Sequence, residues 1–392
     1  MNQQTQNFIL KYADEDVNTL ALKAPSFPGV DIPLALRQIE GRQKVKAKIP
    51  TFYSCPTILY PVKLSLEQSS SEITARYKSS LCRGGKLVDL TGGFGIDSYF
   101  FSEKFKEVVY VERQEELCTL AAHNYQELNK SNIQIVNQPA EGFLKNDVTA
   151  DWIYLDPARR KESGAKAVLL SHCEPNVAEL QHALLEKAEN VMIKLSPMFD
   201  LAQLQRELRH IREIHVVAVE NECKEILVLL QRGFTSPVTF KAVHFPKNKA
   251  VEVFELTEEE EKSLTPTYME VIPKYIYEPN AAILKAGAFK SIGNKYLLHK
   301  LHINSHLYVS EKWVDDFPGR IFEIKEVFNF NKTELKKLNI SQANLSVRNF
   351  PLTVNELRKK LKIKEGGSDY IFATTLYNGK KALILCEKLP HR

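Results

Sequence analysis

The sequence predicts an α/β fold with a seven-stranded sheet, and three observations support this prediction. Short apolar runs alternate with amphipathic segments between about residues 84 and 232. The first apolar run leads directly into a glycine-rich turn. The last two runs are separated only by the polar link 220–225, which predicts an antiparallel hairpin at the edge of the sheet. The predicted strands are 87–90, 108–111, 133–136, 152–155, 191–195, 214–219 and 226–230.

The turn after the first strand has the features of a ligand-binding loop. Residues 87–90 suit a buried parallel strand, and Gly92, Gly93 and Gly95 follow at once. Glycine permits the positive φ and the close backbone approach that a sharp strand-to-helix turn around a ligand requires. The sequence therefore predicts a nucleotide-type cofactor at this turn.

Two acidic residues indicate which class of cofactor this turn binds. Glu112 follows the second strand, twenty residues after Gly92, where an acid can hold two ribose hydroxyls. Asp89 precedes the glycines. A dinucleotide site would place a pyrophosphate there, but a carboxylate repels phosphate and attracts an ammonium group. The pattern therefore favours a cofactor with an amino-acid end.

The run from Asp89 to Gly95 resembles the first motif of the class I methyltransferases. The resemblance implies a Rossmann-like methyltransferase sheet and S-adenosylmethionine as the cofactor, with its methionine end near Asp89 and its ribose at Glu112. The residues that it implicates in cofactor binding are Asp89, Thr91, Gly92, Gly93, Gly95 and Glu112. Gln138 follows the third strand, where adenine-contacting acids are common in the family, and is a candidate for the adenine edge.

The fourth predicted strand ends in a second polar motif, Asp156-Pro157-Ala158-Arg159. Active sites of open α/β sheets lie at such strand ends, and the proline holds Asp156 in an extended conformation. The motif resembles the Asp-Pro-Pro-Tyr type of amino-group methyltransferases that act on nucleic acid, whose acid accepts a hydrogen bond from the target amine. Asp156 with Pro157 is thus the catalytic candidate, although Arg159 replaces the aromatic that stacks on a flipped base. A helix or turn cap is the alternative role for Asp156.

Four residues are candidates for substrate binding. Arg159 and Arg160 could hold a substrate phosphate or form ion pairs in a surface loop. Lys194 and Ser196 end the fifth strand and could form a wall of the substrate pocket, or belong to an ordinary strand-to-loop transition. No metal site is predicted, because the ten histidines are scattered and lack nearby cysteine or acid partners.

Composition indicates a soluble globular protein. The chain of 392 residues is 44% hydrophobic and 26% charged, and no apolar run approaches the roughly 20 residues that cross a bilayer. Its start lacks a basic region followed by an apolar core, so we expect no secretory signal and a cytoplasmic location. The six cysteines include no Cys-x-x-Cys pair, and we expect most of them to be reduced.

The length of the chain and the changes in composition along it predict four structural parts. These are a proline-rich helical N-terminal module (1–64), the methyltransferase domain (65–235), a small α+β module (236–320) and a basic α+β domain (321–392). The last part holds 14 Lys or Arg against 7 Asp or Glu, and five of these cations lie within 358–364. A second basic run spans 37–48. Basic runs are often only solvated faces, so charge alone leaves nucleic-acid binding open.

The combination resembles a family of methyltransferases with a ferredoxin-like insert and a THUMP-like C-terminal domain, and the match covers most of the chain beyond about residue 60. THUMP domains accompany RNA-modifying enzymes. The resemblance therefore implies a methyltransferase that modifies tRNA or rRNA at a base. Two alternatives stay open: an RNA-binding protein whose cofactor pocket is vestigial or regulatory, and a methyltransferase acting on a small molecule or a protein. The sequence does not indicate the oligomeric state.

Overall fold

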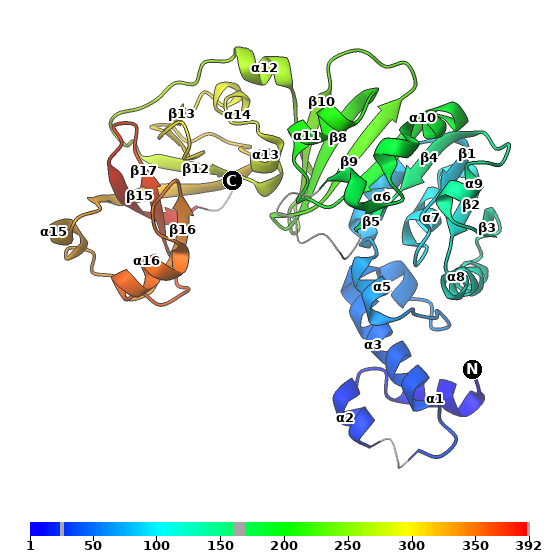
Figure 1. Cartoon of the computed structure of the whole chain (residues 1–392). Coiled ribbons are helices and arrows are strands. Elements are labelled where there is room, and N and C mark those ends of the chain that lie inside the picture. The colour runs from blue at the N-terminus through cyan, green and yellow to red at the C-terminus, as the bar shows by residue number, and fades with distance from the viewer. Residues whose placement is uncertain (24–26, 160–168, 390–392) are drawn as a thin grey trace. The chain divides into compact units, whose positions relative to one another are not determined.

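The computed structural model describes residues 1–23, 27–159 and 169–389 (Figure 1). The chain divides into two compact units, and each is built from two segments. The first unit comprises 1–211 and 228–235, and the second comprises 212–227 and 236–392. In the described residues, no helix is both long and apolar enough to cross a membrane.

The chain begins with short helices: α1 (Gln3–Lys11), α2 (Val17–Leu22), α3 (Ile32–Lys48), α4 (Pro50–Tyr53), α5 (Lys63–Gln68) and α6 (Glu72–Ser80). Side chains of Asn2, Asp16 and Asp31 cap the first three at their N-termini. The second basic run of the sequence lies on α3. Lys44 Nζ pairs with Glu67 at 2.8 Å and Lys48 Nζ donates to the Leu66 carbonyl at 2.7 Å, so these cations attach α3 to α5.

A parallel sheet forms the centre of the first unit. Its strands are β1 (Gly84–Asp89), β2 (Phe105–Glu112), β3 (Ile133–Asn137), β4 (Ala150–Leu155) and β7 (Ala188–Leu195), in the order β3-β2-β1-β4-β7. All four pairings between them are parallel. The predicted α/β fold with its parallel sheet is thus confirmed.

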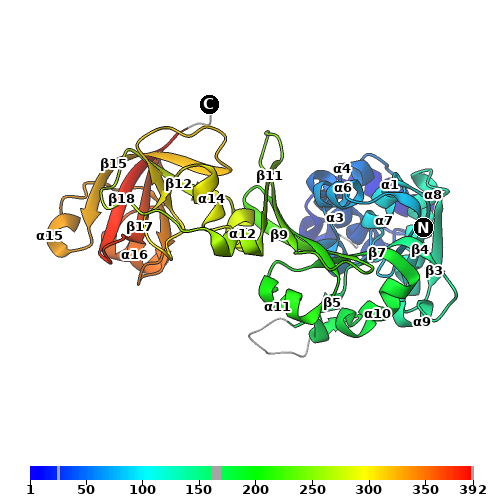
Figure 2. The same ribbon diagram turned by 90° about the horizontal axis from the view of Figure 1, so that it is seen from above.

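Helices cover both faces of this sheet (Figure 2). On one face lie α6, α7 (Ile96–Phe101) and α8 (Glu115–Glu127), and on the other lie α9 (Ala140–Phe143), α10 (Val177–Lys187) and α11 (Leu201–Glu207). Between β4 and α10, the short strands β5 (Ala158–Arg159) and β6 (Cys173–Glu174) pair, and η2 (Leu170–His172) precedes β6. Because both faces are covered, the central strands contain continuous buried apolar runs, such as residues 108–111 of β2 and 152–155 of β4.

The predicted hairpin is formed by β8 (Ile211–Val219) and β9 (Glu222–Gln231), which are neighbours in the sheet. Glu220 and Asn221 connect them, both at positive φ, as in a tight two-residue hairpin turn. The hairpin is not at the sheet edge, so that part of the prediction is wrong. β10 (Thr239–Phe245) pairs in parallel with β8, and β11 (Glu252–Thr257) pairs with β10, so the sheet has nine strands instead of the predicted seven, in the order β11-β10-β8-β9-β7-β4-β1-β2-β3.

A second sheet of seven strands lies within the second unit, in the order β13-β14-β12-β15-β18-β17-β16. The strands are β12 (Tyr275–Pro279), β13 (His299–Lys300), β14 (Tyr308–Ser310), β15 (Gly319–Asn329), β16 (Asn344–Arg348), β17 (Asp369–Thr375) and β18 (Lys381–Lys388). The helices of this unit are α12 (Glu258–Ser263), α13 (Ala281–Ala286), α14 (Ser291–Lys295), α15 (Lys332–Leu335) and α16 (Val354–Leu361).

Glu278 is a buried charged residue that joins three strands of the second sheet. Its side chain on β12 is 2% exposed. One carboxylate oxygen accepts from Arg320 on β15, and the other accepts from Arg348 Nη2 on β16 at 2.8 Å. The Ser346 hydroxyl adds a weaker bond at 3.3 Å. A buried carboxylate needs such partners, because desolvation of an unpaired charge costs several kcal/mol.

Replacement of Glu278 by Gln should therefore weaken the second unit. The change leaves two partly exposed guanidinium groups without their counter-charge, and we expect a loss of about 3 kcal/mol. Hydrogen–deuterium exchange detects this loss of stability as faster exchange of the backbone amides in β12 and β15. Lys325→Ala is the control, because Lys325 pairs with Asp369 and Glu387 on the surface and should contribute less than about 1 kcal/mol. Equal effects of the two changes would contradict the assignment.

Candidate cofactor and acceptor site

The glycine-rich turn lies at the carboxyl end of β1, against the end of β2. Gly95 begins α7 with φ of 86°, and Gly93 has φ of 54°, conformations that glycine adopts without strain. Gly92 lies on the ring of Tyr110, since a Cβ there would come within 2.2 Å of the ring. The Tyr110 hydroxyl in turn donates to the Gly93 carbonyl at 2.6 Å. Tyr110 therefore fixes the height of the turn above the sheet.

Asp89 lies beneath this turn and is almost fully buried, at 1% exposure. Its carboxylate accepts from the Thr91 amide at 3.0 Å and from the Ser98 hydroxyl at 2.6 Å. Burial raises the pKa of Asp89 to about 7, and the hydrogen bonds from Ser98 and Thr91 oppose this rise. A carboxylate in such surroundings gains from a cationic ligand, because a positive charge would favour its ionised form.

Glu112 ends β2 and faces the same turn. One of its carboxylate oxygens accepts from the Gly93 amide at 3.0 Å and the other from the Gln114 amide at 2.9 Å. These bonds fix the side chain in one orientation. Each oxygen retains a lone pair, so the carboxylate can still accept from a pair of ligand hydroxyls.

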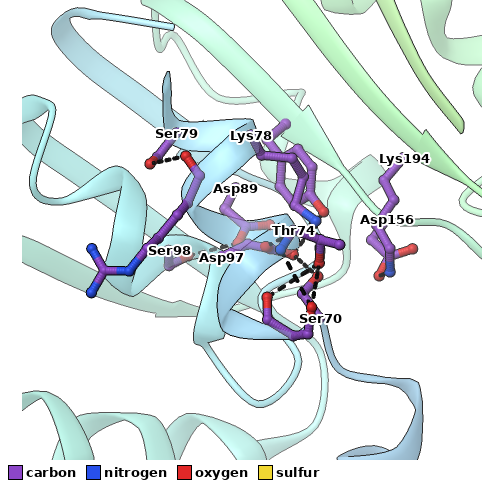
Figure 3. A network of polar contacts seen from close by, with 12 residues as sticks. Ser70, Thr74, Lys78, Ser79, Asp89, Asp97, Ser98, Asp156 and Lys194 are labelled. Atoms are coloured by element: carbon purple, nitrogen blue, oxygen red, sulfur yellow. Dashed lines mark hydrogen bonds and ion pairs between the residues drawn. The ribbon is translucent and has the colours of Figure 1, made fainter. Parts of the chain in front are cut away.

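A buried polar network adjoins Asp89 (Figure 3). Asp97, near the start of α7, pairs with the fully buried Lys78 of α6 at 3.2 Å. Its carboxylate also accepts from the hydroxyls of Ser70 and Tyr154, each at 2.8 Å, and Lys78 Nζ donates to Ser70 Oγ at 3.0 Å. Burial pushes the pKa of Asp97 upward, but Lys78, Lys194 and these hydroxyls together hold it below its usual value.

This network was not predicted from the sequence, although one signal was available. Lys78 shares a helical stripe with Thr74, Ala75 and Ser79, and all four are buried. A lysine in a stripe of small residues needs an acid partner inside the protein. The network connects the segment before β1, through α6, to the helix that begins at the glycine turn.

The second predicted motif lies next to the first. Asp156 follows β4, and its backbone amide donates to Thr91 Oγ1 at 2.6 Å. Lys194, from the carboxyl end of β7, pairs with the Asp156 carboxylate. The lysine side chain is 13% exposed and that of Asp156 is 33% exposed, so the carboxylate is the more accessible member of the pair. Pro157 is buried beside it.

The structure thus brings together most of the predicted residues. Gln138 is exposed, and its backbone amide donates to the Glu112 carbonyl at 3.1 Å, which places it near the ribose candidate. Ser196 Oγ accepts a long bond from the Met198 amide, at 3.4 Å. Arg159 contributes its backbone to β5, while Arg160 lies outside the described residues. In the described parts of the chain no group of three potential metal ligands occurs.

Comparison with known proteins finds similar domains and a similar solved structure. A family profile described as a ferredoxin-like domain matches residues 275–318, and one described as THUMP domain-like matches 319–388. A crystal structure from Porphyromonas gingivalis W83, named a "putative methyltransferase", is 36% identical over 98% of both chains, with a TM-score of 0.89. No match was found among curated proteins.

Other solved structures match only part of the chain. A Streptococcus mutans protein, also named a "putative methyltransferase" and bound to S-adenosylhomocysteine, is 17% identical over 41% of this chain and 96% of its own, with a TM-score of 0.31. TrmK from M. capricolum, also with S-adenosylhomocysteine, is 13% identical over 42% of this chain and 69% of its own, with a TM-score of 0.33.

The glycine turn with its two acids, on a parallel sheet of this order, defines a class I methyltransferase domain. With the full-length match and the two profile matches, the chain belongs to the family of class I methyltransferases that carry a ferredoxin-like domain and a THUMP-like C-terminal domain.

The contact between Gly92 and Tyr110 can be tested by a double-mutant cycle. Gly92→Ala should lower stability by about 1–3 kcal/mol, because the new methyl group overlaps the ring. In a Tyr110→Ala background the same change should cost much less, and thermal unfolding measures both. Gly233→Ala is the control, since a Cβ there meets nothing within 4 Å, so that its cost of about 1 kcal/mol comes from positive φ and should not depend on Tyr110. Additive effects of Gly92→Ala and Tyr110→Ala would show that the ring does not set the cost.

The raised pKa of Asp89 predicts a pH dependence of stability. The folded protein binds the Asp89 proton up to about pH 7, whereas the unfolded chain loses it near pH 3.8. The contribution of Asp89 to the free energy of unfolding therefore falls as the pH rises from 3.8 to 7, and it is constant above pH 7. Asp89→Asn removes this pH dependence. The free energy of unfolding of the variant should therefore increase relative to that of the wild type across this range, by up to about 1.4 kcal/mol per pH unit.

Thermal midpoints of the ligand-free proteins between pH 4 and 8 check this expectation. Asp16→Asn is the matched control, because hydrogen bonds from Thr19 lower the pKa of Asp16 and its contribution is lost only as the pH falls below about 4. The difference between Asp16→Asn and wild type should therefore be constant from pH 4.5 upward. A constant difference for Asp89→Asn as well would mean that Asp89 is ionised throughout.

Proposed function

We propose that this chain is an S-adenosylmethionine-dependent methyltransferase that modifies RNA, tRNA or rRNA, at a base. The observation that carries the proposal is the position of Thr91. Its amide donates to Asp89, and its hydroxyl accepts from the Asp156 amide. One residue thus holds the cofactor acid and the acceptor acid at a fixed separation, which is what a direct transfer between two bound molecules requires.

The residues around the turn fit the cofactor. Asp89 would hold the ammonium group of the methionine end, where the positive charge offsets the burial of the carboxylate. The glycine backbone allows close approach, and Glu112 would accept from the ribose hydroxyls. Gln138 would serve the adenine edge. When bound, the cofactor supplies an electrophilic methyl group, and the protein then needs mainly to align the acceptor with it.

Asp156 is the proposed acceptor-side residue. Its carboxylate would accept a hydrogen bond from the amine that attacks the methyl carbon, which orients the nitrogen lone pair along the line of displacement. Lys194 holds this carboxylate in one orientation through their ion pair, and Pro157 restricts its backbone. Arg159, Arg160 and Ser196 complete the proposed substrate contacts, the arginines with a phosphate of the RNA.

RNA as the substrate is supported by two features of the second unit. The THUMP domain-like match covers 319–388, and THUMP domains accompany RNA-modifying enzymes. The same region carries 14 basic against 7 acidic residues in 321–392, a distribution suited to a polyanion. We place the reaction in the cytoplasm, in keeping with six cysteines that are all free thiols.

One observation favours a second candidate, an RNA-binding protein that does not transfer methyl groups. The Asp156 carboxylate is already engaged by Lys194, and the aromatic residue of the related motif is replaced. In that case the pocket would still bind the cofactor as a regulatory ligand. The third alternative is a methyltransferase that acts on a small molecule or a protein. The identity of the labelled product distinguishes it from the other two candidates.

The decisive test uses methyl-labelled S-adenosylmethionine and total RNA from cells that lack this gene. Label should enter RNA with the wild-type protein. Asp156→Ala should reduce transfer by at least about a hundredfold, because the acceptor amine loses its orienting group, while the affinity for S-adenosylhomocysteine changes less than about threefold. Calorimetry measures the second quantity. Full turnover by Asp156→Ala would remove Asp156 from the mechanism, and binding without any transfer would favour the second candidate.

A further inference from the structure

A surface of the second unit, outside the candidate site, gathers lysines and aromatic rings. It is centred on the hairpin that links β17 and β18, close to where β15 ends, and it includes part of α16 and the loop after β13. We call it the hairpin face and define it by His302, Phe330, Lys359, Lys360, Tyr377, Lys380 and Lys381. The strands and helix that carry it are drawn in orange and red in Figure 1.

Direct contacts make the β15 and α16 side of this face continuous. The Phe330 amide donates to the Lys381 carbonyl at 2.9 Å, which joins the end of β15 to the hairpin. Lys360 Nζ lies 4.7 Å from the centre of the Phe330 ring, and that ring packs edge-on against Phe350 at 4.8 Å. The cation of α16 is therefore held beside the rings.

A second set of contacts extends the face to the loop after β13. Lys381 Nζ donates to Thr375 Oγ1 at 2.5 Å, and this hydroxyl donates to the Asn349 carbonyl. Asn349 also bonds His302 Nδ1 through its side chain, at 3.1 Å. Residues 302 and 349 come from the regions matched by the ferredoxin-like and THUMP-like profiles respectively, so both parts contribute to one surface.

The cations of the face form no ion pair within the described chain, although Lys359 lies near enough to Glu356 to help lower the pKa of that carboxyl. Lys359, Lys360 and Lys380 are exposed and Lys381 is half-buried. Lys325 of the same domain is different, because it pairs with two acids. A group of unpaired cations repel one another, and a polyanion that binds there relieves the repulsion and releases its counterions.

Tyr377 gives the face an exposed ring at the tip of the hairpin. It is 50% exposed, and its ring stacks on that of Tyr268, with centroids 4.9 Å apart and planes 28° apart. The partner ring supports one side of Tyr377, and the hairpin holds it through backbone bonds between residues 376 and 380. A rigid exposed tyrosine of this kind is a stacking platform for an unpaired base.

His302 adds a neutral donor. Its Nδ1 accepts from the Asn304 amide and lies against the Asn349 amide group, both at 3.1 Å, so the ring proton belongs on Nε2. Burial, Lys381 and Lys300 lower the pKa of His302, in agreement with this neutral form. An Nε2–H group beside the lysines can donate to a phosphate oxygen.

We propose that the hairpin face binds an unpaired stretch of RNA, with phosphates at the lysines and one base on Tyr377. The inference rests on the proposed function and deepens it, because it names the surface that holds the RNA. A protein partner fits the face less well, since lysine is depleted in protein interfaces and exposed unpaired lysines dominate here.

The test measures binding of a fluorescent, unstructured single-stranded RNA of about 12 nucleotides to the full chain, by anisotropy. The triple change Lys359→Glu, Lys360→Glu and Lys380→Glu should weaken binding at least about tenfold and reduce the slope of log affinity against log salt by about 2. Tyr377→Ala should weaken binding about tenfold without changing this slope, because stacking does not release counterions.

The control is a triple with the same change of charge, at Lys104, Lys106 and Lys145 of the first unit, all to Glu. These lysines are exposed, so affinity should change less than about threefold. Thermal midpoints verify that all variants fold. The proposal is overturned if the face triple binds RNA like wild type, if the control loses as much, or if polyglutamate of equal charge displaces the RNA as well as unlabelled RNA does.

Methyl transfer assays on the same variants separate this inference from the function on which it rests. If the face variants transfer methyl groups to RNA as well as the wild type does, the proposal for the hairpin face is wrong and the methyltransferase proposal stands. RNA binding that depends on the face, without transfer by the wild type, would retain the face and refute the methyltransferase.

Discussion

The candidate site depends on the parallel pairing of β1 with both of its neighbours. Asp89 is in register with Tyr110 of β2 and with Tyr154 of β4. Because parallel strands direct their carboxyl ends to the same edge, this pairing brings Asp89, Glu112 and Asp156 together although 67 residues separate the first from the last. The two tyrosines of the register then support the turn and the buried network from opposite sides of β1.

Local patterns were enough to predict the parallel strands and the position of the glycine turn at the end of β1. The glycines, Asp89 and Glu112 can be recognised in the sequence, because each stands at the end of a strand that a short apolar run predicts. The network of Ser70, Lys78, Asp97 and Tyr154 was not predicted, because its members come from three separate elements and the loop before α6, and a lysine or an aspartate on a helix usually faces solvent. The pairing of β10 with β8 was missed for a similar reason. Strand pairing is a long-range property that a polar stretch between two strands does not encode.

The buried pair of Lys78 and Asp97 illustrates what such a network contributes. Replacing a buried ion pair by apolar groups is often neutral for stability, so the pair is weak evidence for a gain in free energy. Its geometry is more informative. With Ser70 it connects the segment that precedes β1 to the first turn of α7, so that the surroundings of the glycine turn are set by a directional contact as well as by packing.

The contact between Gly92 and Tyr110 also limits how this family can evolve. A larger residue at position 92 is accessible only after the ring at position 110 has become smaller, yet loss of that ring removes the hydroxyl that binds Gly93. Each intermediate along such a path is worse than either end. The two positions should therefore change together or not at all among descendants of a common ancestor, and a lineage that escapes this constraint should have found another way to support the turn.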